Sequence, residues 1–475
     1  MSGEKIFKLT FLGIIIIEFL SLFSYLNHEL GQILFFIISV AVLIAALIKI
    51  NFGFYILLAE IFIGSKGYLF SLTIGDINLS IRIVIFLIIF LAWLIQKLKT
   101  KKIATPKDNL IYLYLLFFIF VAAGLIIGLI KNNLIDVFFD FNAWLFFALI
   151  LLFFEQIKST KQLHNIIAVL IAASTWLAIK SIFIFCLFSH GLATIGGYFY
   201  KWIRDSGVGE ITYLHDNIFR IFFQSQIYNI IGLLIIFFIL INNWSKLNIK
   251  YRWLGAGYLY LSGITIIISQ SRSFWVGLVA GLLFLLLISK INFSYSWKKI
   301  IFTGILIATM FLSQLLIIQI IAGNFTGNLI SSRLTGSQAS AADSTRANEL
   351  EPLKQGIFNH PIFGSGFGAK LTYKSQDPRV LKNNPDGQYT TYAFEWGYLD
   401  IWLKIGLLGL ISYLVLIGQI IHQSAKKYHS DDRGIIIAGL VAGLVAVIVT
   451  NIFSPYLNHP LGINYLMIVS AAIIF

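Results

Sequence analysis

LGAGYLYLSGITIII at residues 254–268 and FWVGLVAGLLFLLLI at residues 274–288 flank the short polar segment SQSRS at 269–273. With their neighbours, these two apolar runs reach about 18 residues each, the length that predicts membrane-spanning helices. Arg272 therefore lies at a membrane boundary, where a guanidinium is costly to desolvate and fills space poorly. Two interpretations are open: Arg272 binds an anion, or it is an anchor whose charged end reaches the interface.

The composition extends this pattern to the whole chain. Of the 475 residues, 58% are hydrophobic and only 12% are charged, and the mean hydropathy is +0.86. Backbone groups in lipid need internal partners, and the apolar runs are too long and continuous for barrel strands, so we expect an all-α polytopic membrane protein. The single cysteine, Cys186, excludes an intrachain disulfide bond.

We expect about fourteen spans of roughly 20 residues each. Residues 1–8 form a short basic segment without the cleavage site of a leader, and the first permanent span follows directly. Lys66 and Gly67 interrupt the third span, and the last one is short. The expected spans are residues 9–26, 30–48, 51–70, 79–96, 108–130, 137–154, 163–188, 218–242, 253–270, 273–289, 300–321, 394–422, 434–453 and 460–475.

The formal net charge of +14 raises the question of nucleic-acid binding, which the positions of the lysines argue against. The basic residues gather in short loops, each after an even number of expected spans. Such a distribution indicates that these loops and the N-terminus face the cytoplasm. The clusters are Lys97, Lys99, Lys101 and Lys102; Lys158 and Lys161; Lys246, Lys250 and Arg252; Lys290, Lys298 and Lys299; and Lys426 and Lys427.

Only two outer loops are long, and they set the domain division. Residues 1–321 hold the first eleven expected spans and the smaller outer loop 190–217; residues 322–393 form a large outer catalytic loop; and residues 394–475 hold the last three spans. In the large loop we expect a flexible stretch at 331–342 and a helix at 344–358, with Asp343 or Ser344 as its N-cap. Because ATP and sugar nucleotides lie on the other side, chemistry here needs a substrate that a lipid carrier has already activated.

Three motifs at the large loop carry candidate functional residues: DSTRANE at 343–349, NHPIFGSGFG at 359–368, and FEWGYL at 394–399 continuing to KIGLLG at 404–409. Alternate glycines let a backbone approach a substrate closely and can present N–H groups to phosphate. An ordinary turn is the competing interpretation. On the first interpretation Gly364 and Gly366 bind substrate.

Together with Ser271-Arg272, these motifs resemble the O-antigen ligase/polymerase superfamily, in its Wzy-type and WaaL-type branches. The resemblance covers roughly residues 253–410, and the N-terminal half matches only in hydropathy. In the ligase branch the loop closes with His-Asn before Tyr-Leu, whereas this chain has Glu395-Trp396. That departure favours the polymerase branch. The resemblance implies a GT-C-like fold.

The resemblance implies a metal-independent, inverting glycosyltransferase without a cofactor. A hydroxyl of one glycan attacks the anomeric carbon of another glycan carried on undecaprenyl diphosphate, and the lipid diphosphate leaves. Fixed cations should stabilise the leaving group, and Arg272 and Arg346 are the catalytic candidates. The competing interpretation of Arg346 is an ion pair with Glu349 or Asp343 on a solvated helix.

The attacking hydroxyl needs a proton acceptor, and Glu395 at the mouth of a span is the catalytic candidate. Its competing interpretation is an interfacial carboxylate paired with a neighbour. Glu349 is the reserve base and a candidate substrate contact. For Asp400 and Lys404, one helical turn apart, a structural ion pair is favoured.

Further candidate substrate contacts are cationic or aromatic. An ordinary hydrated loop is the alternative for the charged residues, and an aromatic membrane belt is the alternative for the rings. Charged residues within spans should pair in the bundle, with proton relay as the rival idea. The substrate candidates are Arg204, His215, Arg220, His360, Tyr392 and Tyr398, and the charged span residues are Glu18, Glu60, Asp140 and Lys180.

We therefore expect a multi-pass polymerase of the bacterial inner membrane, with its active site facing the periplasm or exterior. Its partners would be the lipid bilayer, the lipid-linked oligosaccharide, and chain-length regulator and flippase proteins. No outer residues have the spacing of a metal site. Two alternatives stay open: a ligase that moves the polymer to lipid A core or protein, and a flippase for lipid-linked oligosaccharide.

Overall fold

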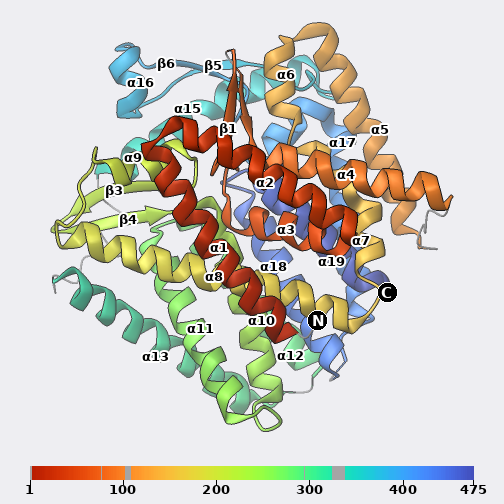
Figure 1. The fold of residues 1–475 in the computed structure, drawn as a ribbon, viewed down its shortest axis with the longest axis vertical. Coiled ribbons are helices and arrows are strands. Elements are labelled where there is room, and N and C mark those ends of the chain that lie inside the picture. Colours follow the sequence, from red (N-terminus) through yellow and green to blue (C-terminus); the bar gives the residue numbers. More distant parts are fainter. Residues whose placement is uncertain (1–2, 76, 102–107, 294, 324–336, 430) are drawn as a thin grey trace.

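A computed structural model describes residues 3–75, 77–101, 108–293, 295–323, 337–429 and 431–475. Most of these residues are helical (Figure 1). The helices of the first half are α1 (Gly3–Leu26), α2 (His28–Ile48), α3 (Ile50–Ile63), α4 (Ile81–Thr100), α5 (Leu110–Lys131), α6 (Leu134–Phe141), η1 (Trp144–Leu149), α7 (Ile150–Gln156), α8 (Thr160–Ser189), α9 (Tyr198–Asp205), η2 (Gln224–Gln226) and α10 (Ile227–Asn243).

The second half continues the helical bundle up to the C-terminal residues. Its helices are α11 (Ile249–Ile268), α12 (Arg272–Ile291), α13 (Trp297–Ala322), α15 (Ser337–Asn359), α16 (Pro378–Asn383), α17 (Gly397–Ala425), α18 (Asp432–Thr450) and α19 (Pro460–Ile474).

Each expected span coincides with a helix or a bent helix pair. Among the described residues, ten helices are long and apolar enough to cross a membrane, and the pair α6 with η1–α7, bent by 48°, makes eleven. The helices α3 and α19 are apolar but shorter, and α11 carries Lys250 and Arg252 in its first turn. The chain is thus an all-α membrane protein with 10 to 11 candidate spans.

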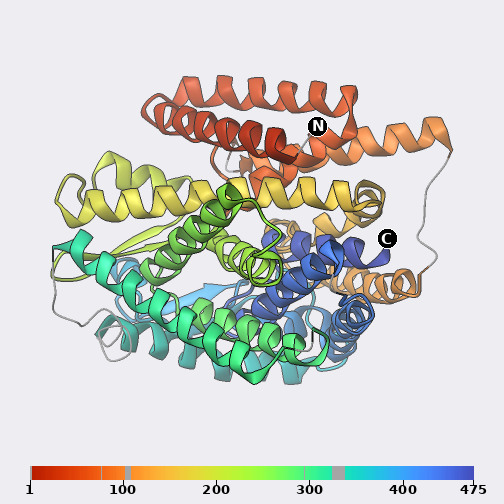
Figure 2. The ribbon, with the colours of Figure 1, turned by 90° about the horizontal axis from the view of Figure 1, so that it is seen from below.

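The centre of the bundle is formed by α10 and α18, in each of which 78% of the residues of an apolar 18-residue segment are buried. These helices pack on each other, and α12 packs on both. At the periphery, α2 and α13 each bury only 17% of the residues of the corresponding segment. Figure 2 shows α1 and α2 as a separate layer lying over the long helix α8. Since exposed leucine, isoleucine and phenylalanine side chains cover these outer helices, lipid is their natural surrounding.

Three two-stranded antiparallel sheets interrupt the helices in the part of the chain that the structure describes. They are β1 (Ser71–Ile74) with β2 (Ile77–Ser80), β3 (Glu210–His215) with β4 (Ile218–Phe222), and β5 (Leu371–Lys374) with β6 (Gln388–Thr391). The expected span 51–70 ends as a helix at Ile63, because residues 64–70, which include Lys66 and Gly67, form turns. The expected span 218–242 begins as strand β4, and this boundary was wrong because a short apolar strand and the end of a helix look alike in sequence.

The two ends of the bundle differ. The hairpins, α9, α15 and α16 lie toward one side of the molecule, and both chain termini lie toward the other (Figure 1). One basic loop lies beside the N-terminus, because Lys250 Nζ is 4.0 Å from the carboxylate of Glu4. Lys97, near the end of α4, pairs with Glu155 of α7 at 2.7 Å.

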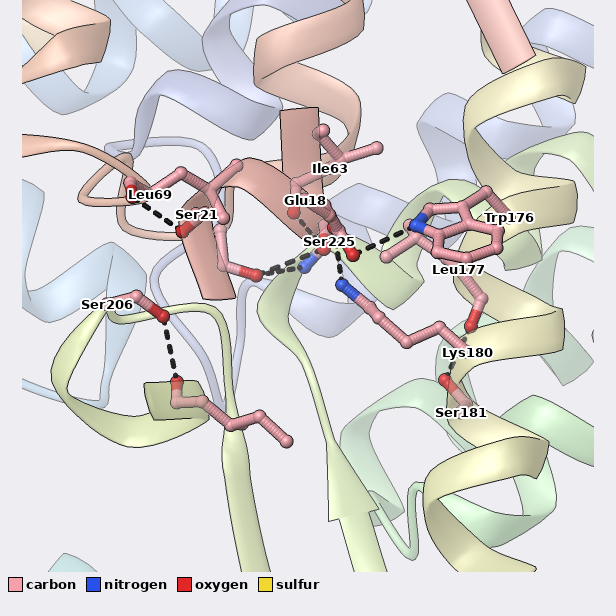
Figure 3. Close-up of polar contacts among 12 residues, drawn as sticks. Glu18, Ser21, Ile63, Leu69, Trp176, Leu177, Lys180, Ser181, Ser206 and Ser225 are labelled. Atoms are coloured by element: carbon pink, nitrogen blue, oxygen red, sulfur yellow. Dashed lines mark hydrogen bonds and ion pairs between the residues drawn. The ribbon is translucent and has the colours of Figure 1, made fainter. Parts of the chain in front are cut away.

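Charged residues inside the bundle are paired. Lys180 of α8 donates to Glu18 of α1 at 2.6 Å, and the indole N–H of Trp176 donates to the second oxygen of the same carboxylate at 2.9 Å (Figure 3). Arg82 of α4 donates to Glu60 of α3 at 2.8 Å. Removing one partner of such a pair leaves an uncompensated buried charge, which is strongly destabilising. These pairs join neighbouring helices, as the pairing interpretation predicted.

The large loop is more regular than the sequence indicated. Helix α15 begins at Ser337, so the prediction that Asp343 or Ser344 caps a helix starting at 344 was wrong. Of the stretch expected to be flexible, 337–342 is helical and 331–336 lies outside the described residues. The longer helix places Asp343 and Arg346 in its interior, where their side chains share one face.

Candidate functional site

Helix α15 is joined by one ion pair to the first residue of α12 and by a second ion pair to the segment just before α17. Both Nη atoms of Arg272, the first residue of α12, donate to the carboxylate of Asp343, one of them at 2.8 Å. The Nε atom of Arg346 donates to the carboxylate of Glu395, just before α17. Because Asp343 and Arg346 are three residues apart on one helix, the two ion pairs start from the same face of α15.

Apolar packing fixes α15 in this position. Leu353 and Ile357 are buried against Phe394 and Leu403, which flank the start of α17, and against Tyr373 of β5. Leu353 and Ile357 lie on the same face of α15 as Asp343 and Arg346. The face that carries the two charged residues therefore also packs against the bundle. The charged pairs therefore sit at the edge of a packed surface rather than on a free helix.

Glu349, one turn beyond Arg346, is the most buried acidic group of this site, with 1% of its surface exposed. Its carboxylate accepts the backbone N–H of Glu395 at 3.1 Å and the hydroxyl of Tyr373. Burial, followed by the nearby charge of Glu395, raises the pKa of Glu349 to about 7. The indole N–H of Trp396 donates to the carbonyl of Arg346 at 3.0 Å. Residues 395–396 are thus held to α15 by three contacts.

The glycine run after α15 packs against α17 instead of lying open. The N–H of Gly364 donates to the carbonyl of His360 at 2.9 Å, and that of Gly366 donates to the carbonyl of Lys404 at 3.1 Å. Both glycines have positive φ, 78° and 82°. A Cβ at Gly366 would meet the backbone N of Gly128 at 2.4 Å. These glycines permit close backbone contact with α5 and α17, and phosphate binding by them stays a prediction.

A buried charged cluster lies beneath the glycine run. Lys404 of α17 donates to both Asp140 of α6 and Asp400, the latter at 2.9 Å. Asp140 also accepts the N–H of Gly368 at 2.8 Å, and Asn458 donates to Asp400. The ion pair of Asp400 with Lys404 that the sequence favoured is confirmed, and Asp140 joins it from a distant helix. The cluster fastens the glycine run to α6 and α17.

Arg220 supports the turn that carries Arg272. From β4, its Nε donates to the carbonyl of Ser269 at 3.1 Å, and its guanidinium lies over the ring of Phe222 at 4.6 Å. In the same turn Gln270 has a φ of +49°, a conformation that few non-glycine residues adopt. Arg220 therefore lies beside the site, and its contact with substrate stays a prediction.

Other predicted substrate contacts lie on separate elements. Arg204 Nη1 donates to the hydroxyl of Tyr200 in its own helix α9 at 3.0 Å. His215 lies at the end of β3, and its Nδ1 is 3.3 Å from a carboxylate oxygen of Asp216. His360 is an exposed residue after α15. The hydroxyl of Tyr398 donates to the carbonyl of Ile448 in α18 at 2.8 Å, which joins α17 to α18.

Tyr392 lies between β6 and α17, on the side of the buried cluster. It is half-buried, and burial raises the pKa of its hydroxyl, with smaller contributions from the charges of Asp140 and Asp136. Contact of Tyr392 with substrate stays a prediction.

Two carboxylates named from the sequence have partners that the sequence did not indicate. Asp343 pairs with Arg272 rather than with Arg346, and Asp140 pairs with Lys404. Helical spacing places Asp343 and Arg346 on one face, but both observed partners are distant in the sequence. Within the described ranges, no group of three or more His, Cys, Asp or Glu side chains is placed to hold a metal ion.

Comparison with known proteins places this site in a family domain. Residues 257–414 match the model of the Wzy_C family, described as O-antigen ligase. The matched segment runs from α11 into α17 and includes both ion pairs, Glu349 and the glycine run. It confirms the resemblance indicated by the motifs. No curated protein and no solved structure matches the chain.

The raised pKa of Glu349 predicts a pH-dependent stability. The folded protein holds a proton up to about pH 7, whereas the unfolded chain releases it near pH 4.5, so rising pH should favour unfolding between these values. We expect the melting temperature, followed by tryptophan fluorescence in detergent, to fall from pH 5 to 8, and Glu349→Gln to flatten this slope. The exposed neighbour Glu351→Gln is the control; equal slopes in wild type and Glu349→Gln would show the assignment to be wrong.

Proposed function

Because residues 257–414 form an O-antigen ligase family domain, we propose that the chain is a polysaccharide polymerase. It joins oligosaccharide repeat units carried on undecaprenyl diphosphate at the outer face of the bacterial inner membrane and releases undecaprenyl diphosphate. The observation that carries this proposal is a pair of guanidinium groups bound along α15: Arg272, at the start of the span α12, pairs with Asp343, and Arg346 of α15 pairs with Glu395, just before the span α17.

The arginines suit the leaving group. When the glycosidic bond to the diphosphate breaks, negative charge concentrates on the departing phosphate oxygens. Planar guanidinium groups can each hold two such oxygens, and donors that are fixed before the reaction stabilise developing charge most effectively. Two guanidinium groups bound along one face of α15 would each hold one of the two phosphates of the leaving group. No metal ion is needed in this scheme.

Glu395 is the proposed base. The hydroxyl oxygen of the acceptor sugar forms a bond to the anomeric carbon of the donor, on the face opposite the diphosphate. The bond from that carbon to the phosphate oxygen breaks, its electron pair leaves with the lipid diphosphate, and the hydroxyl proton passes to the carboxylate of Glu395. Configuration at the anomeric carbon is thereby inverted. Glu349, buried behind Glu395, positions it through the backbone N–H.

The membrane arrangement follows from the two-sided fold. We propose about fourteen spans, with α3, α11 and α19 completing the bundle. The N-terminus faces the cytoplasm, as the basic loops indicate, and residues 190–217 and 322–393 face outward. The lipid-linked donor reaches the site from the bilayer. Flippase and chain-length regulator proteins are the partners that such a reaction requires before and after polymer assembly.

A ligase is the second candidate, because the matching family is described by that activity. A ligase shares the donor, the arginines and the leaving group, and differs in its acceptor. The polymerase is favoured by Glu395-Trp396, which stands where the ligase branch carries His-Asn. The two activities separate cleanly in a reconstituted reaction.

Purified protein supplied with lipid-linked repeat units alone, in the presence of EDTA, should produce a ladder of polymer lengths on a gel. Product that forms only after a second acceptor is added would identify a ligase. Movement of the lipid-linked units across a vesicle membrane without bond formation would identify a flippase. Loss of activity in EDTA that Mg²⁺ restores would contradict metal independence.

Arg272→Ala should lower the rate of polymer formation about 10²–10³-fold, the range for removing one charge-stabilising donor. The protein should still be expressed and inserted, because the Arg272 side chain is part-exposed. Lys354→Ala, at an exposed position of α15, is the matched control and should retain the wild-type rate. An Arg272→Ala enzyme with wild-type chain length in cells would remove this arginine from the mechanism.

Glu395→Gln should reduce kcat more than it changes the KM for the donor, because the amide cannot accept the proton. The readout is the rate of undecaprenyl diphosphate release at several pH values, with Glu351→Gln as the control. A Glu395→Gln enzyme that equals wild type at every pH would exclude Glu395 as the base.

A further inference from the structure

Both arginines of the site already hold carboxylates. Arg272 grips Asp343 through two parallel hydrogen bonds, and Arg346 grips Glu395. The bidentate geometry at Arg272 is the one that a phosphate group also adopts on a guanidinium. A phosphate that binds the same two N–H donors of Arg272 has to replace the Asp343 carboxylate. Donor binding at this site is therefore a competition between carboxylate and phosphate.

The ion pairs of Arg272 and Arg346 are suited to such an exchange, whereas the buried ion pairs inside the bundle are not. The side chains of Asp343 and Glu395 are 49% and 48% exposed, so water can solvate each carboxylate when its arginine is taken. Exposed pairs of this kind contribute little to stability. In contrast, Lys404 and its two aspartates are at most 5% exposed, and separating them would strand buried charges.

We propose that Asp343 is an exchangeable counter-ion of the donor site: its carboxylate pairs with the Arg272 guanidinium while the site is empty and is displaced by the diphosphate of the donor. The inference rests on the proposed function and adds a residue to it. The same exchange at Arg346 releases the Glu395 carboxylate, so the base loses its counter-ion only when a donor is present. Donor arrival and release of the base are thereby coupled.

The proposal makes Asp343 a competitor of the substrate, and this distinguishes it from a residue that merely fastens α15 to α12. Asp343→Asn keeps the shape and removes the charge. We expect its KM for the lipid-linked donor to fall about two- to fivefold, the factor that corresponds to an exposed ion pair, with kcat unchanged. Asp343→Glu should restore the wild-type KM. A fastening role predicts the opposite, a higher KM and a lower melting temperature.

The experiment measures donor KM and kcat from undecaprenyl diphosphate release, and binding of undecaprenyl diphosphate itself to the full-length protein in nanodiscs. Asp343→Ser is a second variant in case Asp343→Asn does not fold, and Glu351→Gln on the same helix controls for surface charge. Tighter donor binding in Asp343→Asn or Asp343→Ser, but not in Glu351→Gln, supports the proposal.

An unchanged or higher KM in the folded Asp343 variants overturns it. An equal fall in KM for Glu351→Gln also overturns it, because the effect would then come from general surface charge. If wild-type protein neither forms polymer nor binds undecaprenyl diphosphate, the proposed function fails, and this result is distinct from failure of the exchange at Asp343.

Discussion

Burial decides which ion pairs of this molecule are permanent. In a chain with few charges, Glu18 with Lys180 and Lys404 with two aspartates are buried between helices, where neither partner can be left alone. At the starts of α12 and α17, the pairs of Arg272 and Arg346 are part-exposed. The first kind joins the bundle, and the second kind is the one for which we propose exchange with another anion.

The buried contacts of the bundle position α15 and the part-exposed ion pairs that it carries. The cluster around Lys404 holds the glycine run at 364–368 between α5, α6 and α17, and this run follows directly from α15. Leu353 and Ile357 seat α15 against the start of α17. The position of Arg346 on α15 thus depends on buried contacts in which its guanidinium takes no part. Such preorganisation is what a charge-stabilising site requires.

The sequence predicted the helical membrane fold, the approximate spans and the ion pair of Asp400 with Lys404, because apolar length and helical spacing are local signals. It did not predict the hairpins at 71–80 and 210–222, whose short apolar strands continue into span-like runs. The partners of Arg272 and Lys404 lie 71 and 264 residues away, and no local pattern encodes such pairing. The role of Glu395 stays a prediction, and its pairing with Arg346 depends on how α15 packs.

The most direct test is an electron cryomicroscopy structure of the protein in lipid nanodiscs with undecaprenyl diphosphate bound. The account predicts phosphate density within hydrogen-bonding distance of both the Arg272 and Arg346 guanidinium groups, with the carboxylates of Asp343 and Glu395 turned away from them. Diphosphate bound elsewhere while Arg272 stays on Asp343, or an Arg272 side chain directed into the acyl chains, would contradict it.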